Sequence, residues 1–464
     1  MSKRILKYGL FFSLIGIVFI SSCGVTKEYV KPEMNIDSLY RDIQNSDTNS
    51  MAHLSWREVF TDSYLQDLIE TGLTNNPDLE IAYLNIQQAE AYFNQSKAAF
   101  LPNLNLSAGV DESRLPEAQR FGRGSNITQY NVAASATWEA DIWGKLKSSK
   151  RAELANLLAT TEAARAVKTR LISTIASYYY QLIAMDEQLA ITEKTVENWN
   201  STVNTMRALK EAASVTEAAV VQSEAQRYAA EVTIPDLIQA IRETENALSI
   251  LLGSQPSEIS RGSIIHQTLP TSLNIGIPAQ LLANRPDVLQ AELQFRQQFE
   301  LANLARTYFY PSVSITGSAG FNSVDISNLL DPASFIASIG AGLTQPIFNR
   351  RLNKTRLEVA LLQQEVALLN FKTALLNAGR EVSDALSLYE TSNQKISVRQ
   401  KQTDALEKAV DYTQELLEND FANYTEVITA RQSLLQAELG EVNDHLERLI
   451  SVVNLYRSLG GGWK

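Results

Sequence analysis

The sequence predicts a mainly α-helical protein with a small β part, built from a duplicated unit. Three observations support this: a stretch without glycine or proline that is far longer than a globular helix, segments in which apolar and polar residues alternate, and landmarks that recur at one spacing. Together they favour long antiparallel coiled-coil helices and short strands that occur twice along the chain.

The longest predicted helix begins near Lys145. Neither glycine nor proline occurs between Gly144 and Pro235, whereas an average globular helix has about 11 to 12 residues. Seam residues then follow spacings of 4 and 3 without interruption, as in a coiled coil. They are Leu171, Ile175, Tyr178, Leu182, Met185, Leu189, Thr192, Val196, Trp199, Val203 and Met206. We expect one helix from Lys145 to Ala208, roughly 95 Å long at 1.5 Å per residue.

Two shorter helices are expected beside it, from about Ser63 to Phe100 and from about Thr216 to Leu252, with a kink at Pro235 in the second. Two short helices laid end to end match one long helix, which favours a hollow helical cylinder. The antiparallel helices must turn at its far tip. The tip turns are expected between Leu209 and Val215, including Glu211, and between Asn419 and Tyr424.

Several landmarks recur 209 residues apart. Pro311 follows Pro102 at this offset, and the same offset joins Asn76-Pro77-Asp78 to Arg285-Pro286-Asp287 and Thr216-Glu217 to Thr425-Glu426. The chain is therefore interpreted as a duplicated unit. Its expected domains are a signal peptide at 1–22, an N-terminal segment at 23–60, a first repeat at 61–253, a linker at 254–277 and a second repeat at 278–464.

Each repeat contains two segments of period-2 alternation, expected as strands at about 103–112, 129–140, 312–322 and 335–346. Strands of about 9 to 11 residues can cross a bilayer when tilted, with one apolar and one polar face. Open sheet edges are not tolerated in hydrocarbon, and a closed barrel needs about eight strands, so one chain cannot close it alone. Three chains would supply twelve strands. The alternative is a soluble antiparallel sheet.

The N-terminus has the pattern of a lipoprotein signal peptide. Basic residues at 3, 4 and 7 precede an apolar stretch at 9–20 that is too short to span a bilayer, and Ser21-Ser22-Cys23 follows. Cys23 is the only cysteine, so an intrachain disulfide is impossible. We expect diacylglycerol on Cys23, which places the protein body outside the cytoplasm of a bacterium. An ordinary signal with an incidental cysteine is the alternative.

The charge and composition of the chain disfavour nucleic-acid-binding proteins, metalloproteins and enzymes. The net charge is −11, and removal of the three basic residues of the signal peptide lowers it to −14, which disfavours nucleic-acid binding. The three histidines are far apart and show no metal-ligand spacing. No nucleophile or acid–base pair stands at a motif spacing. We therefore expect no enzyme activity, no metal, and no cofactor apart from the lipid on Cys23.

Several motifs resemble those of the TolC-like outer-membrane factors, specifically their NodT-type lipoprotein branch. They are Ile277-Pro278-Ala279-Gln280-Leu281-Leu282-Ala283-Asn284-Arg285-Pro286-Asp287, the Phe-X-Pro segments at Phe100 and Phe309, Asp141-Ile142-Trp143-Gly144, Gln345-Pro346-Ile347-Phe348, and Leu455-Tyr456-Arg457-Ser458-Leu459-Gly460-Gly461-Gly462-Trp463. They cover nearly the whole mature chain.

The resemblance implies a homotrimer with a 12-strand barrel in the outer membrane, a helical periplasmic tunnel, and a mixed equatorial belt of N-terminal segment, linker and C-terminal end. It also implies an exit channel for drugs or other small solutes, lipid-anchored with most of its mass in the periplasm. Expected partners are outer-membrane lipid, a periplasmic adaptor and an inner-membrane transporter. A type I protein-secretion duct is the alternative within the family.

In the family, a turn glycine and a short acidic motif form the periplasmic gate. By resemblance Glu426 takes the first acidic position, Thr429 replaces the second carboxylate, and Asp420 and Glu211 stand where the turn glycines would be, so that Asp420 is a displaced gate carboxylate. The alternative is that Glu426 is a solvated helix-start residue favoured by the helix dipole.

Two classes outside channel transport also fit parts of the sequence. A periplasmic adaptor would combine a lipid anchor with a single helical hairpin between compact β domains, but the hairpin here is duplicated. A structural coiled-coil lipoprotein would need no alternating strands. Both therefore explain less of the sequence than the channel does.

Overall fold

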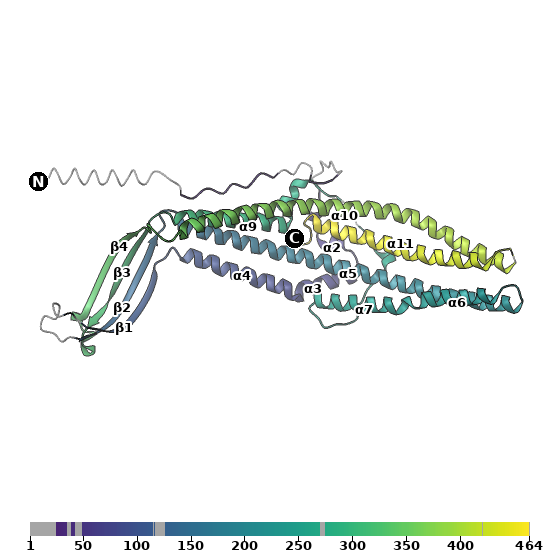
Figure 1. Cartoon of the computed structure of the whole chain (residues 1–464), viewed down its shortest axis with the longest axis horizontal. Helices are drawn as coiled ribbons and strands as arrows, with labels where there is room; N and C mark the ends of the chain where they lie inside the picture. The colour runs from purple at the N-terminus through teal and green to yellow at the C-terminus, as the bar shows by residue number, and fades with distance from the viewer. Residues whose placement is uncertain are drawn as a thin grey trace. The chain divides into compact units, whose positions relative to one another are not determined.

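The computed structural model describes residues 25–34, 39–41, 49–114, 116, 126–269, 274–419 and 421–463. A similar series of helices and strands occurs twice, with the single helix α11 of the second repeat in place of α6 and α7 of the first (Figure 1). In the first repeat it comprises α3 (Ser63–Asn75), α4 (Pro77–Ala98), β1 (Asn103–Arg114), β2 (Asn126–Ala140), α5 (Lys145–Glu211), α6 (Glu217–Glu231) and α7 (Thr233–Leu251). In the second it comprises α8 (Leu281–Asn284), α9 (Pro286–Thr307), β3 (Ser312–Ser323), β4 (Phe335–Thr344), α10 (Leu352–Glu418) and α11 (Tyr424–Ser458). The predicted fold class is confirmed.

The chain divides into two compact units. One comprises Met1–Glu33, Gln87–Ala159 and Ala291–Asn370 and contains the whole sheet; the other comprises Met34–Ile86, Thr160–Gln290 and Phe371–Lys464 and contains both helix turns. They are called here the sheet unit and the turn unit. The turn unit has a hydrophobic core that includes Trp199, Tyr179 and Phe371 among its largest fully buried side chains.

The prediction of one helix from Ser63 to Phe100 was wrong, because the chain forms two helices there. Asn76 separates α3 from α4 with an extended backbone (φ −68°, ψ 122°). Pro77 explains the break, since proline disfavours helical geometry in the residue before it but fits the first position of a helix. Arg285 has the same extended backbone (φ −84°, ψ 115°) before Pro286.

The helix predicted from Thr216 to Leu252 is also divided. It breaks at Val232, between α6 and α7, and Val232 is followed three residues later by Pro235. Proline has no N–H to bond the carbonyl four residues back, and its ring clashes with that carbonyl. The expected interruption is therefore present, but it lies one turn before the proline.

The four strands form one antiparallel sheet in the order β1-β2-β3-β4 (Figure 1). The pairing register brings Leu106 opposite Ala134, Ala134 opposite Ala319, and Ala319 opposite Ala337. Strand β4 ends at Thr344, two residues before the predicted end, because Pro346 cannot donate a ladder hydrogen bond. Both edge strands, β1 and β4, lack a second strand partner within the described residues.

This register places the predicted apolar residues on one face of the sheet and the polar ones on the other, because side chains alternate along a strand. The apolar face carries Leu104, Leu106, Ala108, Val110, Tyr130, Val132, Ala134, Ala136, Trp138, Val313, Ile315, Ala319, Phe321, Phe335, Ala337, Ile339, Ala341 and Leu343. The opposite face carries mainly Asn, Ser, Thr and Gly. The predicted alternation is confirmed in all four strands. Within the described part of the chain, no helix is both long and apolar enough to cross a membrane.

Three segments distant in sequence meet in the turn unit. Met51 N donates to Asn274 O at 2.8 Å, which joins the N-terminal segment to the linker. The hydroxyl of Tyr456 donates to Leu54 O at 2.8 Å, which joins the C-terminal end to the same segment. The resemblance assigns these three segments to one mixed belt, and the contacts bring them together.

Candidate functional site at the helix turns

The turn from α5 to α6 ends the long helix in a Schellman motif. Ser214 N donates to Leu209 O and Ala213 N to Lys210 O, each at 2.9 Å. Ala213 has a left-handed backbone (φ 64°), which is the position that glycine normally takes. Glu211, the turn-glycine position by resemblance, is the last residue of α5 and lies two residues before this left-handed position.

The turn from α10 to α11 lies between Asn419 and Tyr424. Phe421 N donates to Leu416 O at 2.8 Å, which closes the end of α10. Asn423 caps α11, because its side-chain oxygen accepts from Thr425 N at 3.1 Å. Asp420 lies outside the described residues.

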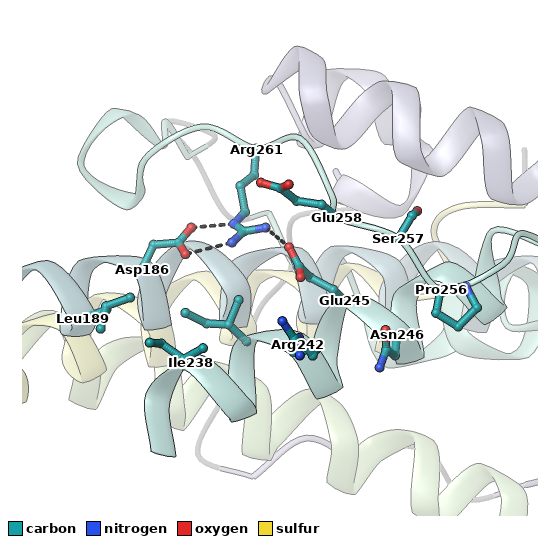
Figure 2. Close-up of a pocket in the computed structure, with 11 residues that line it drawn as sticks. Asp186, Leu189, Ile238, Arg242, Glu245, Asn246, Pro256, Ser257, Glu258 and Arg261 are labelled. Carbon is teal, nitrogen blue, oxygen red and sulfur yellow. Dashed lines mark hydrogen bonds and ion pairs between the residues drawn. The ribbon is translucent and has the colours of Figure 1, made fainter. Parts of the chain in front are cut away.

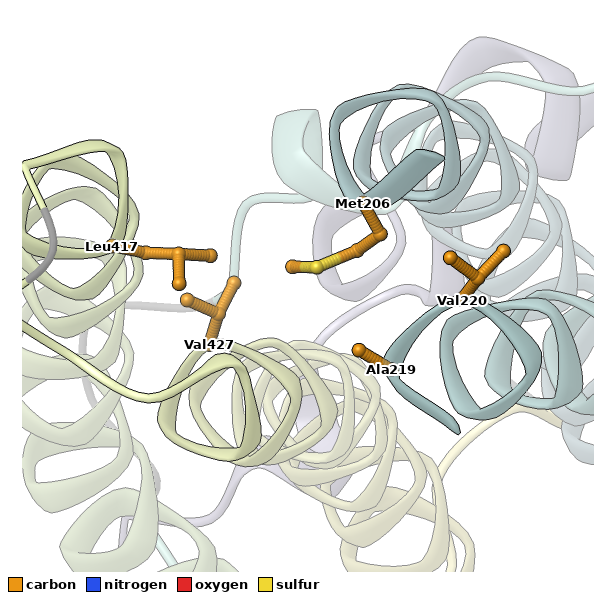
Figure 3. Packing of buried hydrophobic residues seen from close by; sticks show 5 residues of the cluster. All are labelled: Met206, Ala219, Val220, Leu417 and Val427. Atoms are coloured by element: carbon orange, nitrogen blue, oxygen red, sulfur yellow. The ribbon is translucent and has the colours of Figure 1, made fainter. Parts of the chain in front are cut away.

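An apolar cluster joins the two turns (Figure 3). Met206, Ala219 and Val220 come from α5 and α6, and Leu417 and Val427 come from α10 and α11. Leu209 and Tyr424 pack against this cluster. Below, the two turns with this cluster are called the tip. A cavity of about 450 Å³ lies beside the cluster, between the two turns. Phe421 lines this cavity, and its side chain is 81% exposed.

Glu426 and Thr429 are both exposed near the start of α11, while the intervening Val427 and Ile428 are buried. Residues three apart share a helix face, so Glu426 and Thr429 lie on the face of α11 that points away from the core. The Thr429 hydroxyl donates to Thr425 O at 2.8 Å, within its own helix. No hydrogen bond or ion pair engages the Glu426 carboxylate within the described part of the chain.

Polar groups also join the two helices within each hairpin of the turn unit. Arg431 on α11 donates to Gln414 on α10 at 2.5 Å. Burial lowers the pKa of Arg431, and the nearby Asp411 carboxylate partly opposes that shift. Across the first turn, Lys210 forms an ion pair with Glu217.

Arg285, from the Arg-Pro-Asp motif, is almost fully buried in the turn unit. Its guanidinium donates to Asp287 at 2.9 and 2.5 Å, to Glu381 at 2.9 Å and to the Ser458 carbonyl at 3.1 Å. Burial lowers the pKa of Arg285, but the bonds to Asp287 and Glu381 outweigh it and hold this pKa above its ordinary value. Arg285 therefore ties the start of α9 to α10 and to the end of α11.

The first repeat contains an equivalent contact. Asn76 Nδ2 donates to Leu251 O at 2.9 Å, so in both repeats the residue before the proline bonds the last carbonyl of the returning helix. A glycine completes each contact. The backbone at Gly253 (φ 68°) passes so close to Asn75 O that an added Cβ would lie only 2.3 Å from this oxygen. An added Cβ on Gly460 (φ 89°) would likewise lie 2.5 Å from Asn284 O. The Gly-Gly-Gly-Trp end is therefore a close-packed helix stop.

Arg261 ties the linker to α5 and α7 within the turn unit (Figure 2). It makes a bidentate contact to Asp186 of α5 at 2.5 and 2.9 Å and also donates to Glu245 of α7. The Asp186 hydrogen bonds are the largest cause that raises the pKa of Arg261, and the Glu245 bond adds to it. Sequence reasoning missed this cluster, because a lone arginine in a linker carries no spacing signal.

Cys23, like Asp420, lies outside the described residues, so its predicted lipidation stays a prediction. The predicted tip residues Leu209, Glu211, Asn419 and Tyr424 all border the two turns. The apolar cluster was missed in part. Met206 is the last residue of the predicted seam, but Ala219, Val220, Leu417 and Val427 were not predicted as its neighbours.

Two long helical hairpins that meet at one tip, with a short sheet that is apolar on one face, define a channel protein of the bacterial envelope. The chain belongs to the outer membrane efflux protein family, whose matches cover residues 68–254 and 277–461. It is an outer-membrane exit channel of the tripartite efflux type. The two matched segments coincide with the two structural repeats.

Individual relatives are similar along their whole length. The Cation efflux system protein CusC of Escherichia coli O6:H1 is 29% identical, over 96% of this chain and 97% of that protein. The Solvent efflux pump outer membrane protein SrpC of Pseudomonas putida is 28% identical, over 97% of both. A crystal structure of CusC matches with a TM-score of 0.83 and 28% identity, over 94% of this chain and 99% of that chain.

Proposed function

We propose that three copies of the chain form one duct through the outer membrane and that its tip engages a periplasmic adaptor and an inner-membrane transporter. The duct passes drugs or other small solutes from the periplasm to the exterior. A lipid on Cys23 anchors each copy, and no catalytic group, further cofactor or nucleic acid takes part. Most of the mass of the protein then lies in the periplasm.

One observation carries the trimer proposal: the sheet is open. Within the part of the chain that the structure describes, strands β1 and β4 each have an unpaired edge, and one face of the sheet is apolar. In a bilayer every backbone donor and acceptor must be satisfied within the protein. Pairing of β1 in one copy with β4 in the next satisfies both edges, and three copies give the twelve strands of a closed sheet. The apolar face then meets lipid, and the polar face lines water.

Similarity to named relatives does not select the cargo. CusC is named for cation efflux and SrpC for solvent efflux, and their identities to this chain are 29% and 28%. A water-lined duct selects by size and charge at its narrowest point. Small solutes are therefore the proposed cargo class, with the inner-membrane transporter choosing among them.

We expect the purified protein to behave in detergent as an oligomer of about three chains and to form conducting pores in planar bilayers. Light scattering coupled to size exclusion gives the mass of the particle, and current recordings report the pores. The physical reason is that four strands cannot close a barrel. A monodisperse monomer that forms no pores would contradict both the trimer and the duct.

We further propose that Glu426 contributes to a selective constriction at the tip. Three copies of an exposed carboxylate at a narrow aperture repel each other and attract cations. Thr429 shares its helix face and adds a hydroxyl, and Asp420 is the proposed second carboxylate of the ring. Release of this repulsion when an adaptor binds is the proposed opening step.

Glu426→Ala should weaken the cation preference of single channels and their block by divalent cations, because it removes three negative charges from the aperture. Reversal potentials in a salt gradient measure the preference. Glu193→Ala is the matched control, since Glu193 is also exposed but lies 18 residues before the end of α5, about 27 Å along the helix. Unchanged selectivity in the Glu426 variant would place this carboxylate on the outside of the duct.

A further inference from the structure

A cavity of about 270 Å³ lies within the sheet unit, where the strands end and the long helices begin. It is called here the junction cavity. Its walls come from the end of β2, the start of β3, the end of β4 and the first turns of α5 and α10. The residues that matter below are Trp143, Lys145, Tyr308, Tyr310, Asn353 and Arg356.

The two carboxylates that line the cavity are already engaged. Glu139 accepts from Lys145 Nζ with both oxygens, at 2.9 and 3.0 Å. Asp141 accepts from the backbone N–H groups of Leu146 and Lys147, at 2.9 Å each, and so caps α5. Neither acid therefore competes for a further cation in the cavity.

Arg356 is the cation that remains. Its guanidinium lies 4.7 Å from the centre of the Tyr308 ring, and no carboxylate pairs with it within the described part of the chain. Asn353 Nδ2 donates to the Tyr308 carbonyl at 2.6 Å, and Trp143 packs against Tyr310 in a tilted arrangement with ring centres 5.1 Å apart. The cavity thus combines a free guanidinium with a fixed aromatic wall.

The segment around the cavity is strongly basic in an otherwise acidic chain. Residues 345–358 contain Arg350, Arg351, Lys354 and Arg356 against one acid, Glu358, although the whole chain has a net charge of −11. Glu358 is paired with Arg351, at 3.5 Å. A local positive surplus of this kind attracts an anionic group.

Exposed apolar side chains flank the same cavity. Ile347 is 92% exposed and Phe348 is 87% exposed, and both lie in the short segment between β4 and α10. Cations next to exposed apolar side chains, at the end of a membrane strand, match the two ends of a phospholipid, since the headgroup is anionic and the chains are apolar. A soluble anion would leave Ile347 and Phe348 in water.

The segment that follows Cys23 reaches this edge as well. A Cβ on Gly144 would lie 3.4 Å from the Thr26 side chain, and Lys27 and Asn303 of α9 exchange two hydrogen bonds at 3.0 and 2.9 Å. Tyr29 then packs edge-on against Phe299, with ring centres 5.5 Å apart. Thr26, three residues after Cys23, therefore lies beside Gly144, whose neighbours Trp143 and Lys145 line the junction cavity.

We propose that the junction cavity binds the headgroup phosphate of an anionic phospholipid, with Arg356 as the principal cation and Ile347 and Phe348 against the acyl chains. This inference rests on the proposed membrane position of the strands. The bound lipid would fill the seam between sheet and helices in each copy.

The test is native mass spectrometry of the detergent-purified full-length protein after incubation with dioleoyl phosphatidylglycerol. We expect bound phosphatidylglycerol to exceed bound phosphatidylcholine, and Arg356→Gln to reduce it about tenfold, as expected for the loss of a charge-assisted hydrogen bond. Arg380→Gln is the matched control, because Arg380 is exposed on the same helix and, among the described residues, pairs only with Asp384 at the surface.

The remaining measurements distinguish failure of the lipid-binding inference from failure of the proposed function. Equal binding of the two lipids, or unchanged binding in Arg356→Gln, would overturn the inference. Displacement of the lipid by millimolar inorganic phosphate would show that the cavity takes a free anion, which would overturn it too. Pore formation by the unaltered protein is recorded in parallel, since a protein without pores fails the proposed function whatever lipid it binds.

Discussion

Arg285→Ala is expected to lower the free energy of unfolding by about 3–5 kcal/mol, the usual result of removing one partner from a buried ion pair. Arg285 has a side chain only 6% exposed and bonds two carboxylates. The alanine variant removes one donor from each of Asp287, Glu381 and the Ser458 carbonyl, while Glu381 keeps its contact to Arg457 at 3.6 Å. The midpoint of guanidinium unfolding in detergent, followed by tryptophan fluorescence, measures the loss.

Two matched variants show whether burial is the cause. Arg380→Ala removes a surface pair with Asp384, in which both side chains are more than half exposed, so its cost should stay below about 1 kcal/mol. Asn76→Ala removes the equivalent donor of the first repeat, a neutral one, and should cost about 1–2 kcal/mol. An Arg285 variant as stable as the Arg380 variant would mean that the buried pair contributes nothing net.

If the losses in unfolding free energy follow the order Arg285 > Asn76 > Arg380, the two repeats close their returning helices with equivalent contacts. Both repeats close the returning helix with a side chain donated from just before a proline and with a glycine packed against the preceding carbonyl. At this contact the second repeat has a charged donor, which also bonds Glu381 and so ties the start of α9 to α10.

Most of the fold follows from periodicity. Alternation along four segments predicts the strands and their faces, because a strand with one lipid-facing side must alternate. The heptad seam predicts α5, because nothing between Gly144 and Pro235 breaks a helix. The error at Asn76 was avoidable in principle, since Pro77 disfavours helical geometry in the residue before it.

The site was less predictable, because its contacts are distant in sequence. Arg285 bonds a carbonyl 173 residues away, and a motif does not reveal such a partner. Ala213 takes a left-handed backbone although alanine gives no sign of it. The tip cluster depends on how two hairpins meet, so Val220 and Val427 become neighbours of one core only after the turns have formed.

The apolar face of the sheet gives the second large expected effect. Ile339 is the fifth of ten residues in β4, and its side chain is 85% exposed in the single chain. If that face meets lipid, Ile339→Arg places a charge near the middle of the bilayer, at a cost of about 2–4 kcal/mol in each of three copies. We expect the variant to be depleted from outer-membrane fractions and to form few detergent-resistant oligomers.

Ser338→Arg supplies the decisive comparison, because Ser338 is adjacent in the same strand but points to the opposite face, where its hydroxyl bonds Ser318 at 2.8 Å. Facing water, the new arginine should leave assembly intact and instead shift ion selectivity towards anions in planar bilayers. The two variants add the same side chain at neighbouring positions, so strand propensity and translation are matched. Equal loss of assembly in both would mean that neither face is lined by water, and normal assembly of Ile339→Arg would mean that the apolar face is covered by protein instead of lipid.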